Sequence, residues 1–348
     1  MKIAVLGAGS LGTIIGALIQ KGGYDVDLID VNHKNVDALN QNGAKLTGFL
    51  DTTIPVKAKH PNDYSEVYDI VFLLTKQVFT QDSLTAILPF LHQESIICTL
   101  QNGIPEEQVA SIVGEDRTVG GAVGFGAAWS GPGVSKLTTE FDTMKKYAFD
   151  VGELNGDITE RINMVKKILD AVGHCEITTN IQGVRWSKLL MNSTFSGMSA
   201  ALGCTFGRVL NHADAMKIIA NLADETIKVA HSYHIKLENM QGKNFEFLEL
   251  KDQDAIWDKL DFYHEVWGPH ANLKASMLQD LEKGKRTEIS YINGHVVKKG
   301  EFSNVQTPYN QLVCQLVQQA EEEQAIPDFE KNIVTFQNFL DVNVNAFN

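Results

Sequence analysis

The chain has 348 residues, more than a single hydrophobic core usually serves, so two domains are expected. Hydrophobic residues make up 44% and charged residues 21% of the sequence, and no apolar run approaches the roughly 20 residues that span a bilayer. The formal net charge of −13 excludes a nucleic-acid-binding class, because polyphosphate is bound by clustered Lys and Arg, and no membrane role is expected either.

The start of the chain runs straight into an apolar, strand-like segment at residues 3–6. It lacks the charged, long apolar and cleavage segments of a signal peptide, so we expect a cytoplasmic protein. The 4 cysteines lie far apart and form neither a CxxC pair nor a Cys/His cluster, so we expect buried thiols and no metal site.

The first half of the chain alternates short apolar runs with amphipathic segments, which predicts a parallel sheet with crossover helices. Strands are expected at residues 3–6, 26–29, 70–74 and 95–100. After residue 119 the chain becomes rich in glycine, and residues 134–137 and 147–151 are expected to extend or edge the same sheet. A helix at about residues 158–172 closes this half.

From about residue 182 the strand signals nearly vanish, and a period of about 3.6 residues dominates. Helices are expected at residues 183–202, 213–231 and 307–323. The stretch 236–267 is polar and aromatic with weak periodicity, so short helical pieces and loops are expected there. Residues 341–348 are typical of a frayed tail.

The segment Gly7-Ala8-Gly9-Ser10-Leu11-Gly12 follows the first strand at once and opens an apolar-faced helix, as the dinucleotide-binding fingerprint requires. Gly7 permits the tight turn, Gly9 lets the backbone approach a pyrophosphate, and Gly12 lets the helix pack closely on the strand. Amide groups of the first helical turn, which begins around Ser10 and Leu11, favour the anion. The alternative is a glycine-rich turn without a ligand.

Asp30 ends the second strand, close to the roughly 20-residue offset at which an acidic residue binds the adenosine ribose. Its carboxylate accepts hydrogen bonds from both ribose hydroxyls of NAD and repels the 2′-phosphate of NADP, so NAD is favoured. Two alternatives stay open. Asp30 could instead cap the following helix at residues 32–39. Lys34 could also reach a 2′-phosphate, so NADP remains an alternative cofactor.

Short polar signatures stand at fixed places along the rest of the chain. They are Thr75-Lys76-Gln77, Gln101-Asn102-Gly103, Trp186-Ser187-Lys188-Leu189 with Asn192, Ser276-Met277-Leu278-Gln279-Asp280, Arg286-Thr287-Glu288-Ile289 and Tyr291-Ile292-Asn293-Gly294. In this order and spacing, from residue 1 to about residue 323, the chain resembles the ketopantoate reductase family. The resemblance implies hydride transfer that reduces a small anionic 2-oxo acid, 2-dehydropantoate or a similar one, to the D-2-hydroxy acid, with NADP(H) as the usual cofactor.

Lys188 is the side chain that chemistry favours as the proton donor. Hydride delivery to a ketone creates an alkoxide, which needs a group that stabilises the oxygen and supplies a proton. Asn192 and Ser196 follow four and eight residues later on the same expected helix, so the three side chains share one face. Apolar neighbours would partly desolvate the ammonium, which suits acid–base work, whereas a plain solvent-facing lysine is the alternative.

The resemblance assigns further roles on the substrate side. It implies that Lys188 donates the proton to the substrate carbonyl and that Glu288 lies beside it and keeps it charged and oriented. It also implies that Asn192, Ser196 and Ser276 bind the substrate, with its carboxylate and hydroxyl as targets.

On the cofactor side, the resemblance implies that Asn102 lies between cofactor and substrate and contacts both. Lys76 is implied as another active-site lysine on the cofactor side, at the carboxyl end of its strand. Ligands of open α/β sheets bind at these strand ends, which agrees with both placements.

Two departures from the family pattern bear on the substrate. Ser196 stands where the family often has a second asparagine, and Leu273 stands where a substrate-binding asparagine is expected, beside Asn272. The alternative function is therefore an NAD-dependent D-2-hydroxyacid dehydrogenase for branched or aromatic 2-oxo acids, with aromatic residues of 245–267 around a wider pocket. A remoter alternative is a non-catalytic dinucleotide-binding sensor, which could dispense with Lys188 and Glu288.

Together these patterns predict an α/β fold: a Rossmann-type parallel sheet with helices at residues 1–178, an all-α domain at 179–340 and a tail at 341–348. The active site is expected in the cleft between the domains. Long apolar helix stripes are compatible with a monomer or a homodimer, and a homodimer is the expectation.

The cofactor prediction can be tested directly. Because a carboxylate and a phosphate dianion repel each other at the ribose site, kcat/KM with NADH should exceed that with NADPH, and Asp30→Ala should weaken this preference. Steady-state kinetics with both cofactors measure it. A preference for NADPH of about tenfold or more, worth about 1.4 kcal/mol, would contradict the role of Asp30 and favour Lys34 as a phosphate ligand.

Overall fold

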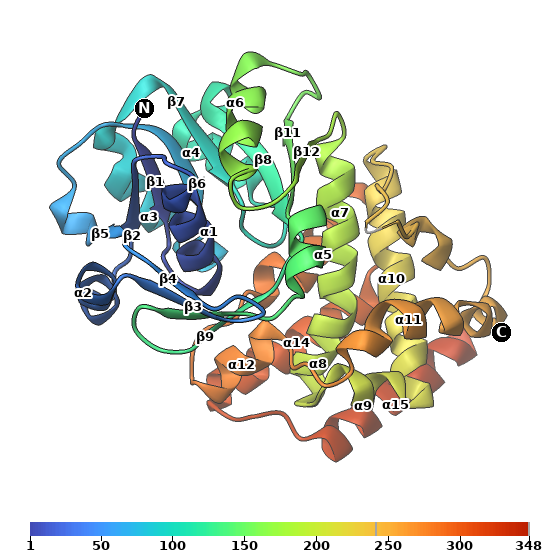
Figure 1. Cartoon of the computed structure of the whole chain (residues 1–348). Coiled ribbons are helices and arrows are strands. Elements are labelled where there is room, and N and C mark those ends of the chain that lie inside the picture. Colours follow the sequence, from blue (N-terminus) through green and yellow to red (C-terminus); the bar gives the residue numbers. More distant parts are fainter. Residues whose placement is uncertain (241, 347–348) are drawn as a thin grey trace. The chain divides into compact units, whose positions relative to one another are not determined.

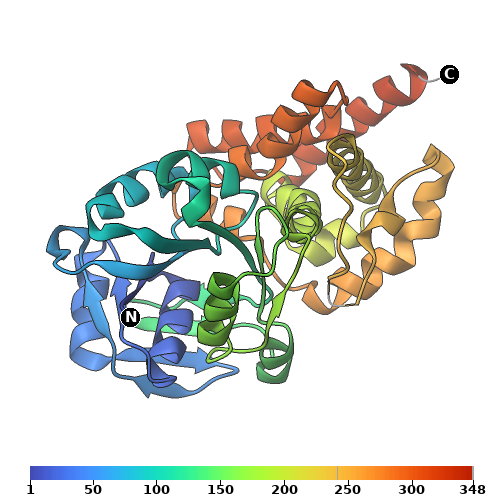
Figure 2. The same ribbon diagram turned by 90° about the horizontal axis from the view of Figure 1, so that it is seen from above.

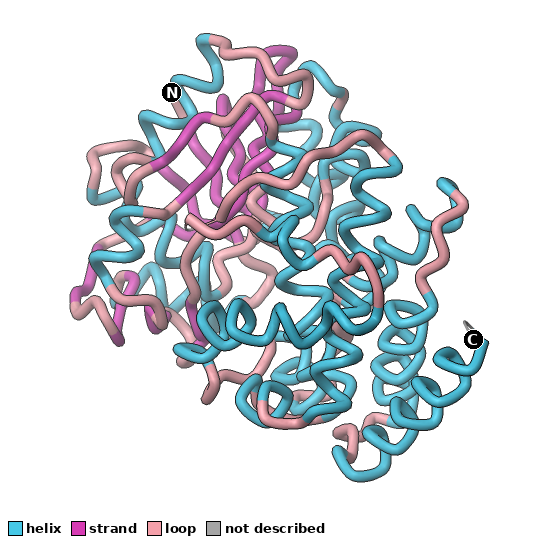
Figure 3. Tube along the Cα trace, turned by 90° about the vertical axis from the view of Figure 1, so that its right-hand side faces the viewer, coloured by secondary structure: helices cyan, strands magenta, loops and turns pink. Residues whose placement is uncertain are grey.

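The computed structural model describes residues 1–240 and 242–346, which divide into two compact units, Met1–Gln182 and Gly183–Asn348 (Figure 1). The sequence predicts this division at residues 178 and 179. Among the described residues the named strands all lie in the first unit, and the second is built of helices and loops (Figure 3). The fold is thus α/β followed by all-α, as predicted.

The first unit is built on an eight-stranded sheet. Its strands, in spatial order, are β12 (Cys175–Ile177), β11 (Phe149–Glu153), β8 (Thr118–Val123), β7 (Leu91–Thr99), β6 (Tyr68–Leu73), β1 (Ile3–Leu6), β2 (Val26–Ile29) and β5 (Lys57–Lys59). Neighbouring strands pair in parallel, except that β11 pairs antiparallel with β8. Of these, β1 and β2 have the predicted bounds, whereas β5 lacks a continuous apolar run and was not predicted.

Helices cover both faces of this sheet (Figures 1 and 2). They are α1 (Ser10–Lys21), α2 (His33–Asn42), α3 (Thr80–Ile87), α4 (Glu106–Val113), α5 (Phe141–Lys146) and α6 (Glu160–Leu169). Alternate residues of β1 enter two cores: Ile3 and Val5 pack with α1 and α6, whereas Ala4 and Leu6 pack with α3 and α4. A strand buried on both faces reads as a continuous apolar run, which is why it was visible in the sequence.

A second, four-stranded sheet lies in the same unit. Its order is β4 (Thr52–Ile54), β3 (Ala44–Gly48), β10 (Val134–Leu137) and β9 (Ala127–Trp129). The prediction that residues 134–137 extend the main sheet is wrong: β10 pairs in parallel with β3, and the second sheet packs on α1. Because α1 lies between two sheets, all its residues from Gly12 to Ile19 are buried.

The second unit is helical, as its 3.6-residue period predicts. Its elements are α7 (Ile181–Met191), α8 (Gly197–Leu202), α9 (Phe206–Leu210), α10 (Ala213–Ser232), α11 (Leu260–Trp267), α12 (Ser276–Glu282), α13 (Asn293–Ser303), α14 (Pro308–Glu323) and α15 (Phe329–Ala346). The single helix expected at residues 183–202 is interrupted by a π-helical segment, Asn192–Ser196, which we call the π-turn. The described residues of 236–267, which leave out residue 241, form short helical pieces and loops, as expected.

The expectation of a tail at residues 341–348 is wrong for 341–346, which continue α15. Phe329, Ile333, Phe336 and Leu340 are buried at helical spacing and hold α15 against the unit, in part against α10. Residues 347 and 348 lie outside the described residues. None of the helices in the described ranges is both long and apolar enough to cross a membrane.

All four cysteines are buried, as expected. Burial raises the pKa of the Cys204 thiol to about 11 and that of Cys314 to about 12. These two thiols therefore stay protonated near neutral pH, which is the state of an inert structural cysteine.

A buried carboxylate in β2 organises the edge of the main sheet. The side chain of Asp27 is fully buried, and its oxygens lie 3.0 Å from the Lys2 Nζ, 2.8 Å from the Lys59 Nζ and 3.0 Å from the Tyr68 hydroxyl. A buried charge is tolerated only when it is paired and hydrogen-bonded, and here two cations and a phenol do this. The cluster joins β1, β2, β5 and β6.

Asp27→Ala should lower the free energy of unfolding by about 3 kcal/mol, because it leaves two lysines and a buried phenol without their shared partner. Asp25 provides the matched control, since its half-exposed carboxylate also binds Lys2. Asp25→Ala should cost less than about 1 kcal/mol. Equilibrium unfolding in urea measures both, and equal losses would contradict the role of Asp27.

Candidate active site

The turn between β1 and α1 brings backbones so close that side chains are excluded. Gly7 has a φ of +104°, and a Cβ there would lie 2.6 Å from the amide nitrogen of Thr75, at the end of β6. A Cβ on Gly12 would lie 2.0 Å from the carbonyl oxygen of Gly7. The two glycines therefore permit the turn and the close packing of α1 on the sheet.

Gly9 differs from its two neighbours in the motif, because a Cβ there would meet nothing within 4 Å. The glycine is therefore not needed for packing, and it leaves space at the N-terminus of α1. The first amide groups of a helix have no partner within the helix and carry its positive dipole end. This open position beside helix amides fits the pyrophosphate of a dinucleotide.

Asp30 lies directly after β2, and its side chain is partly exposed. It accepts hydrogen bonds from the Asn32 amide at 2.8 Å and from the Asn35 side chain at 2.9 Å. The cap of α2 is Asn32, whose side chain accepts from the Lys34 and Asn35 amides, so the alternative of Asp30 as the cap is wrong. A carboxylate has about four acceptor positions, which leaves Asp30 able to accept from ribose hydroxyls.

Asn35 is a buried residue that sequence reasoning missed. Its side-chain nitrogen donates to the carbonyl oxygen of Ala8 at 2.9 Å as well as to Asp30, and its oxygen accepts from the Gly133 amide at 2.8 Å. The Asn35 side chain thus joins the glycine turn, Asp30, which is the candidate ribose-binding residue, and the β9–β10 hairpin. Its partners on two sides are main-chain groups, which leave no signal in a sequence.

The loops after β6 and β7, which carry Lys76 and Asn102, are tied together by two buried glutamines. Gln77 donates to the carbonyl oxygen of Asn102. Gln101 donates to the carbonyl oxygen of Thr75 at 2.7 Å. Lys76 and Asn102 are both partly exposed between these anchors. The structure therefore brings these two predicted residues to neighbouring strand ends and holds their loops in register.

In the second unit, α7, the π-turn and α8 form one nearly buried rod. Between Gly183 and Leu202 only Lys188, Met191, Asn192 and Ser196 are partly exposed, and every other residue is buried. The three predicted side chains are thus nearly the whole accessible strip of this rod. Lys188 is thus a partly buried lysine between buried residues, unlike a lysine on a solvated face.

The π-turn decides how these side chains line up. Residues turn by about 100° each in an α-helix, which would leave Ser196 rotated by about 80° from Lys188. A π-turn holds about 4.4 residues, so each turns by about 80°, and Ser196 returns to within about 10° of Lys188. The regular helical spacing assumed from the sequence aligns Ser196 with Lys188 only approximately. The π-turn brings the two side chains closer to one face.

Ser276 and Glu288 lie on other elements of the second unit. Ser276 is exposed at the first residue of α12, a helix that packs against the π-turn and α8. Glu288 is buried just before the turn Ile289–Tyr291. Leu273, which replaces an expected asparagine, is exposed together with Asn272.

Three of the aromatic residues of 245–267 belong to the core of the second unit. Phe245, Tyr263 and Trp267 are buried, and Trp267 stacks on Phe195 of the π-turn with ring centroids 4.4 Å apart. They form an aromatic core that packs against the buried side of the π-turn. The wider acyl pocket expected from the aromatic residues of 245–267 stays a prediction.

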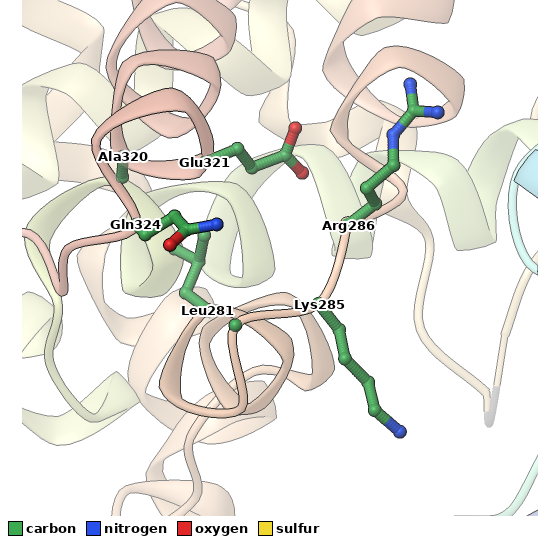
Figure 4. A pocket seen from close by; sticks show the side chains of 7 residues that line it. Leu281, Lys285, Arg286, Ala320, Glu321 and Gln324 are labelled. Carbon is green, nitrogen blue, oxygen red and sulfur yellow. The ribbon is translucent and has the colours of Figure 1, made fainter.

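A small cavity of ≈ 130 Å³ lies between α12 and α14 (Figure 4). Its lining residues are Leu281, Gly284, Lys285, Arg286, Ala320, Glu321 and Gln324. The side chains of Lys285 and Arg286 point in different directions, so their charges do not converge on one position in the cavity (Figure 4). Glu321 accepts a hydrogen bond from the Thr287 amide and so holds the segment that leads to Glu288. None of the predicted site residues lines this cavity.

The first unit has a glycine turn at a helix N-terminus on a parallel sheet, and the second unit is helical and carries a half-buried lysine. These features are typical of a pyridine-nucleotide oxidoreductase that acts on CH–OH groups. The chain belongs to the ketopantoate reductase family. The family description "Ketopantoate reductase PanE/ApbA" matches residues 3–148, and its C-terminal counterpart matches residues 180–321.

Known relatives agree with this placement. A 2-dehydropantoate 2-reductase from Pyrococcus horikoshii is 28% identical over 322 residues, which cover 92% of this chain and 98% of the relative. The structure of a 2-dehydropantoate 2-reductase from Geobacter metallireducens superposes with a TM-score of 0.78 at 26% identity, covering 92% of this chain and 100% of that one. D-mandelate dehydrogenase with NADH and anilino(oxo)acetate superposes with a TM-score of 0.80 at 23% identity, covering 93% and 99%, a likeness of fold.

The glycines yield a matched pair of variants. Gly9→Ala should fold like the wild type but weaken NADH binding by about tenfold or more, because its methyl group enters the space that fits the pyrophosphate. Gly12→Ala should instead lose about 1–3 kcal/mol of unfolding free energy, because its methyl group overlaps the Gly7 carbonyl. Fluorescence titration and urea unfolding measure the two effects. Unchanged NADH affinity in Gly9→Ala would contradict this cofactor site.

Proposed function

We propose that the protein reduces a small anionic 2-oxo acid, 2-dehydropantoate or a similar acid, to the D-2-hydroxy acid, with NADH favoured. The observation that carries the proposal is the accessible strip of Lys188, Asn192 and Ser196 on an otherwise buried rod. Family membership supports the same reaction. The D configuration of the product rests on the family resemblance alone.

Lys188 is the proposed general acid. A bound pyridine nucleotide would supply the hydride that reaches the carbonyl carbon of the substrate. The Lys188 ammonium donates a hydrogen bond to the carbonyl oxygen, and its proton moves to that oxygen as negative charge develops there. Glu288 keeps Lys188 charged beforehand, and the neutral amine takes a new proton from solvent afterwards.

The remaining residues of the proposed site bind and orient. Asn192, Ser196 and Ser276 offer neutral donors for the carboxylate and the hydroxyl of the substrate. In a protein with a net charge of −13, an anionic substrate depends on such local donors and on a lysine. On the cofactor side, Asp30 would accept from the adenosine ribose, Asn102 would lie between cofactor and substrate, and Lys76 would stand near them.

A second candidate is an NAD-dependent D-2-hydroxyacid dehydrogenase for branched or aromatic 2-oxo acids. It is favoured by Asp30 and by Leu273, an exposed apolar side chain where the family offers an amide. The related D-mandelate dehydrogenase, which was solved with NADH and an aromatic oxo acid, gives the same direction. A homodimer stays a prediction, for which sedimentation velocity is the measurement.

The substrate is tested with a panel of 2-dehydropantoate, branched 2-oxo acids and aromatic 2-oxo acids, each with NADH and with NADPH. The methyl ester of each acid is the matched control, because it keeps the ketone and removes the charge. We expect oxidation of NADH with at least one free acid and a far lower kcat/KM with its ester. Equal rates with acid and ester would contradict the proposed function, and the preferred acid decides between the two candidates.

Lys188→Ala should lower kcat at least about 100-fold, the lower end of what general acid catalysis contributes, while folding and NADH binding survive. Glu288→Ala should also lower kcat, and the double variant should lose less than the product of the two losses, because residues that act as one unit are non-additive.

Lys331→Ala is the control for these variants, since Lys331 is an exposed lysine of α15. It should keep the wild-type kcat. If Lys188→Ala retains more than about a third of the wild-type kcat, Lys188 is not the acid, and Lys76 becomes the next residue to test.

A further inference from the structure

The π-turn is held by a hydrogen bond from a residue a hundred positions away in the chain. The side-chain nitrogen of Asn293, at the start of α13, donates to the carbonyl oxygen of Ser193 at 2.8 Å. Both residues are fully buried. A π-turn departs from the regular i to i−4 ladder and is uncommon, so a buried donor to one of its carbonyls favours this geometry over the α-helical one.

Asn293 is itself fixed by a short buried chain of hydrogen bonds. Its nitrogen also donates to the side-chain oxygen of Asn310, at 2.9 Å, and the Asn310 nitrogen donates to Glu225, at 2.7 Å. Glu225 further accepts from the main-chain amides of Tyr309 and Asn310, each at 2.9 Å. The bond from the Asn310 side chain to Glu225 fixes which end of that amide donates, so the Asn310 oxygen faces Asn293 and accepts from it.

Glu225 is an unusual group to bury, because it is an ionisable side chain enclosed in the second unit. Burial raises its pKa to about 8, opposed by the three N–H donors, and Asp224 beside it adds to the rise. Asp224 is paired with Lys228 at 2.6 Å, and the Tyr309 phenol is the other titratable group near Glu225. In some proteins a carboxyl kept at this cost of burial serves to specify one arrangement of its neighbours.

Gly197, the first residue of α8, makes room for the chain of bonds. A Cβ at Gly197 would lie 2.7 Å from the side-chain oxygen of Asn293. Any other residue there would push Asn293 away from Ser193. The glycine, the π-turn and the asparagine are thus parts of one local arrangement.

The same asparagine is tied to the segment of Glu288. The carbonyl oxygen of Glu288 accepts from the amides of Tyr291 and Ile292, at 2.9 and 3.1 Å, so a tight turn leads from Glu288 to Asn293. Asn293 therefore bonds to the π-turn, which carries Asn192 and Ser196, and directly follows the turn that begins at Glu288.

We propose that Asn293, Asn310 and Glu225 are positioning residues of the substrate site: they hold the π-turn so that Asn192 and Ser196 stand in line with Lys188. This inference rests on the proposed function. It predicts that damage to the chain of bonds misplaces substrate donors without touching the cofactor, and misplacement of about 1 Å costs up to about 100-fold in rate.

The chain offers a matched control. Asn332 of α15 is also a buried asparagine, and its side-chain nitrogen donates to the carbonyl oxygen of Ala201 at 2.8 Å. It makes the same kind of bond to the same rod, but to α8, beyond the π-turn. Asn293→Ala and Asn332→Ala should therefore lose similar stability, and only the first should disturb the substrate donors.

The test compares wild type, Asn293→Ala, Asn310→Ala, their double variant and Asn332→Ala, with the best 2-oxo acid of the panel. Asn293→Ala should lower kcat/KM by about tenfold or more, mainly through KM, with NADH affinity within about twofold of wild type. The double variant should lose less than the product of the single losses, because the residues form one network. Asn332→Ala should keep kcat/KM within about threefold.

Hydrogen–deuterium exchange of the peptide that covers residues 190–198 supplies a readout without substrate. Exchange should be faster in Asn293→Ala than in Asn332→Ala. Equal kinetic losses in the two variants, or equal exchange, would overturn the inference while the proposed function stands. If the wild type reduces no acid of the panel, the proposed function fails, and the exchange comparison alone decides whether this network holds the π-turn.

Discussion

The close approach of Gly7 to the end of β6 is the constraint on which the first unit depends. A Cβ atom on Gly7 would lie only 2.6 Å from the amide nitrogen of Thr75, so the turn after β1 has room for glycine alone. This sets where α1 begins and thus where its N-terminal amides point. Asn35 then fixes the turn to Asp30 and to the hairpin of the second sheet. The proposed anion-binding and ribose-binding ends of the cofactor site are consequently parts of one hydrogen-bonded framework.

The second unit solves a similar problem with a helix. An almost fully buried rod must present a few polar groups along one strip, and a regular α-helix rotates away from that strip within two turns. The π-turn corrects the rotation, with Gly197 giving the space and Asn293 giving the bond. The aromatic core of Phe195 and Trp267 supports it from the buried side. The geometry of the proposed substrate site therefore depends on the hydrogen bond to the Ser193 carbonyl group.

The parts that were predictable are those whose physics is local. Strands buried on both faces read as apolar runs, so β1 and β2 have the predicted bounds, and the glycine turn follows from its spacing. The pairing of β10 with β3 could not be predicted, because the partner lies far away in the chain. The π-turn was missed because a 3.6-residue period assumes a regular helix. Asn35 and Asn293 were missed as anchors since they bind main-chain groups, which every sequence contains.

The most direct test follows the hydride itself. NADH that carries deuterium at the transferred C4 position is supplied with the preferred 2-oxo acid, and the product is examined by mass spectrometry and chiral chromatography. Transfer of hydride to the carbonyl carbon predicts a D-2-hydroxy acid with one deuterium bound to C2. A product without deuterium at C2, or one of L configuration, would contradict this assignment of the reaction.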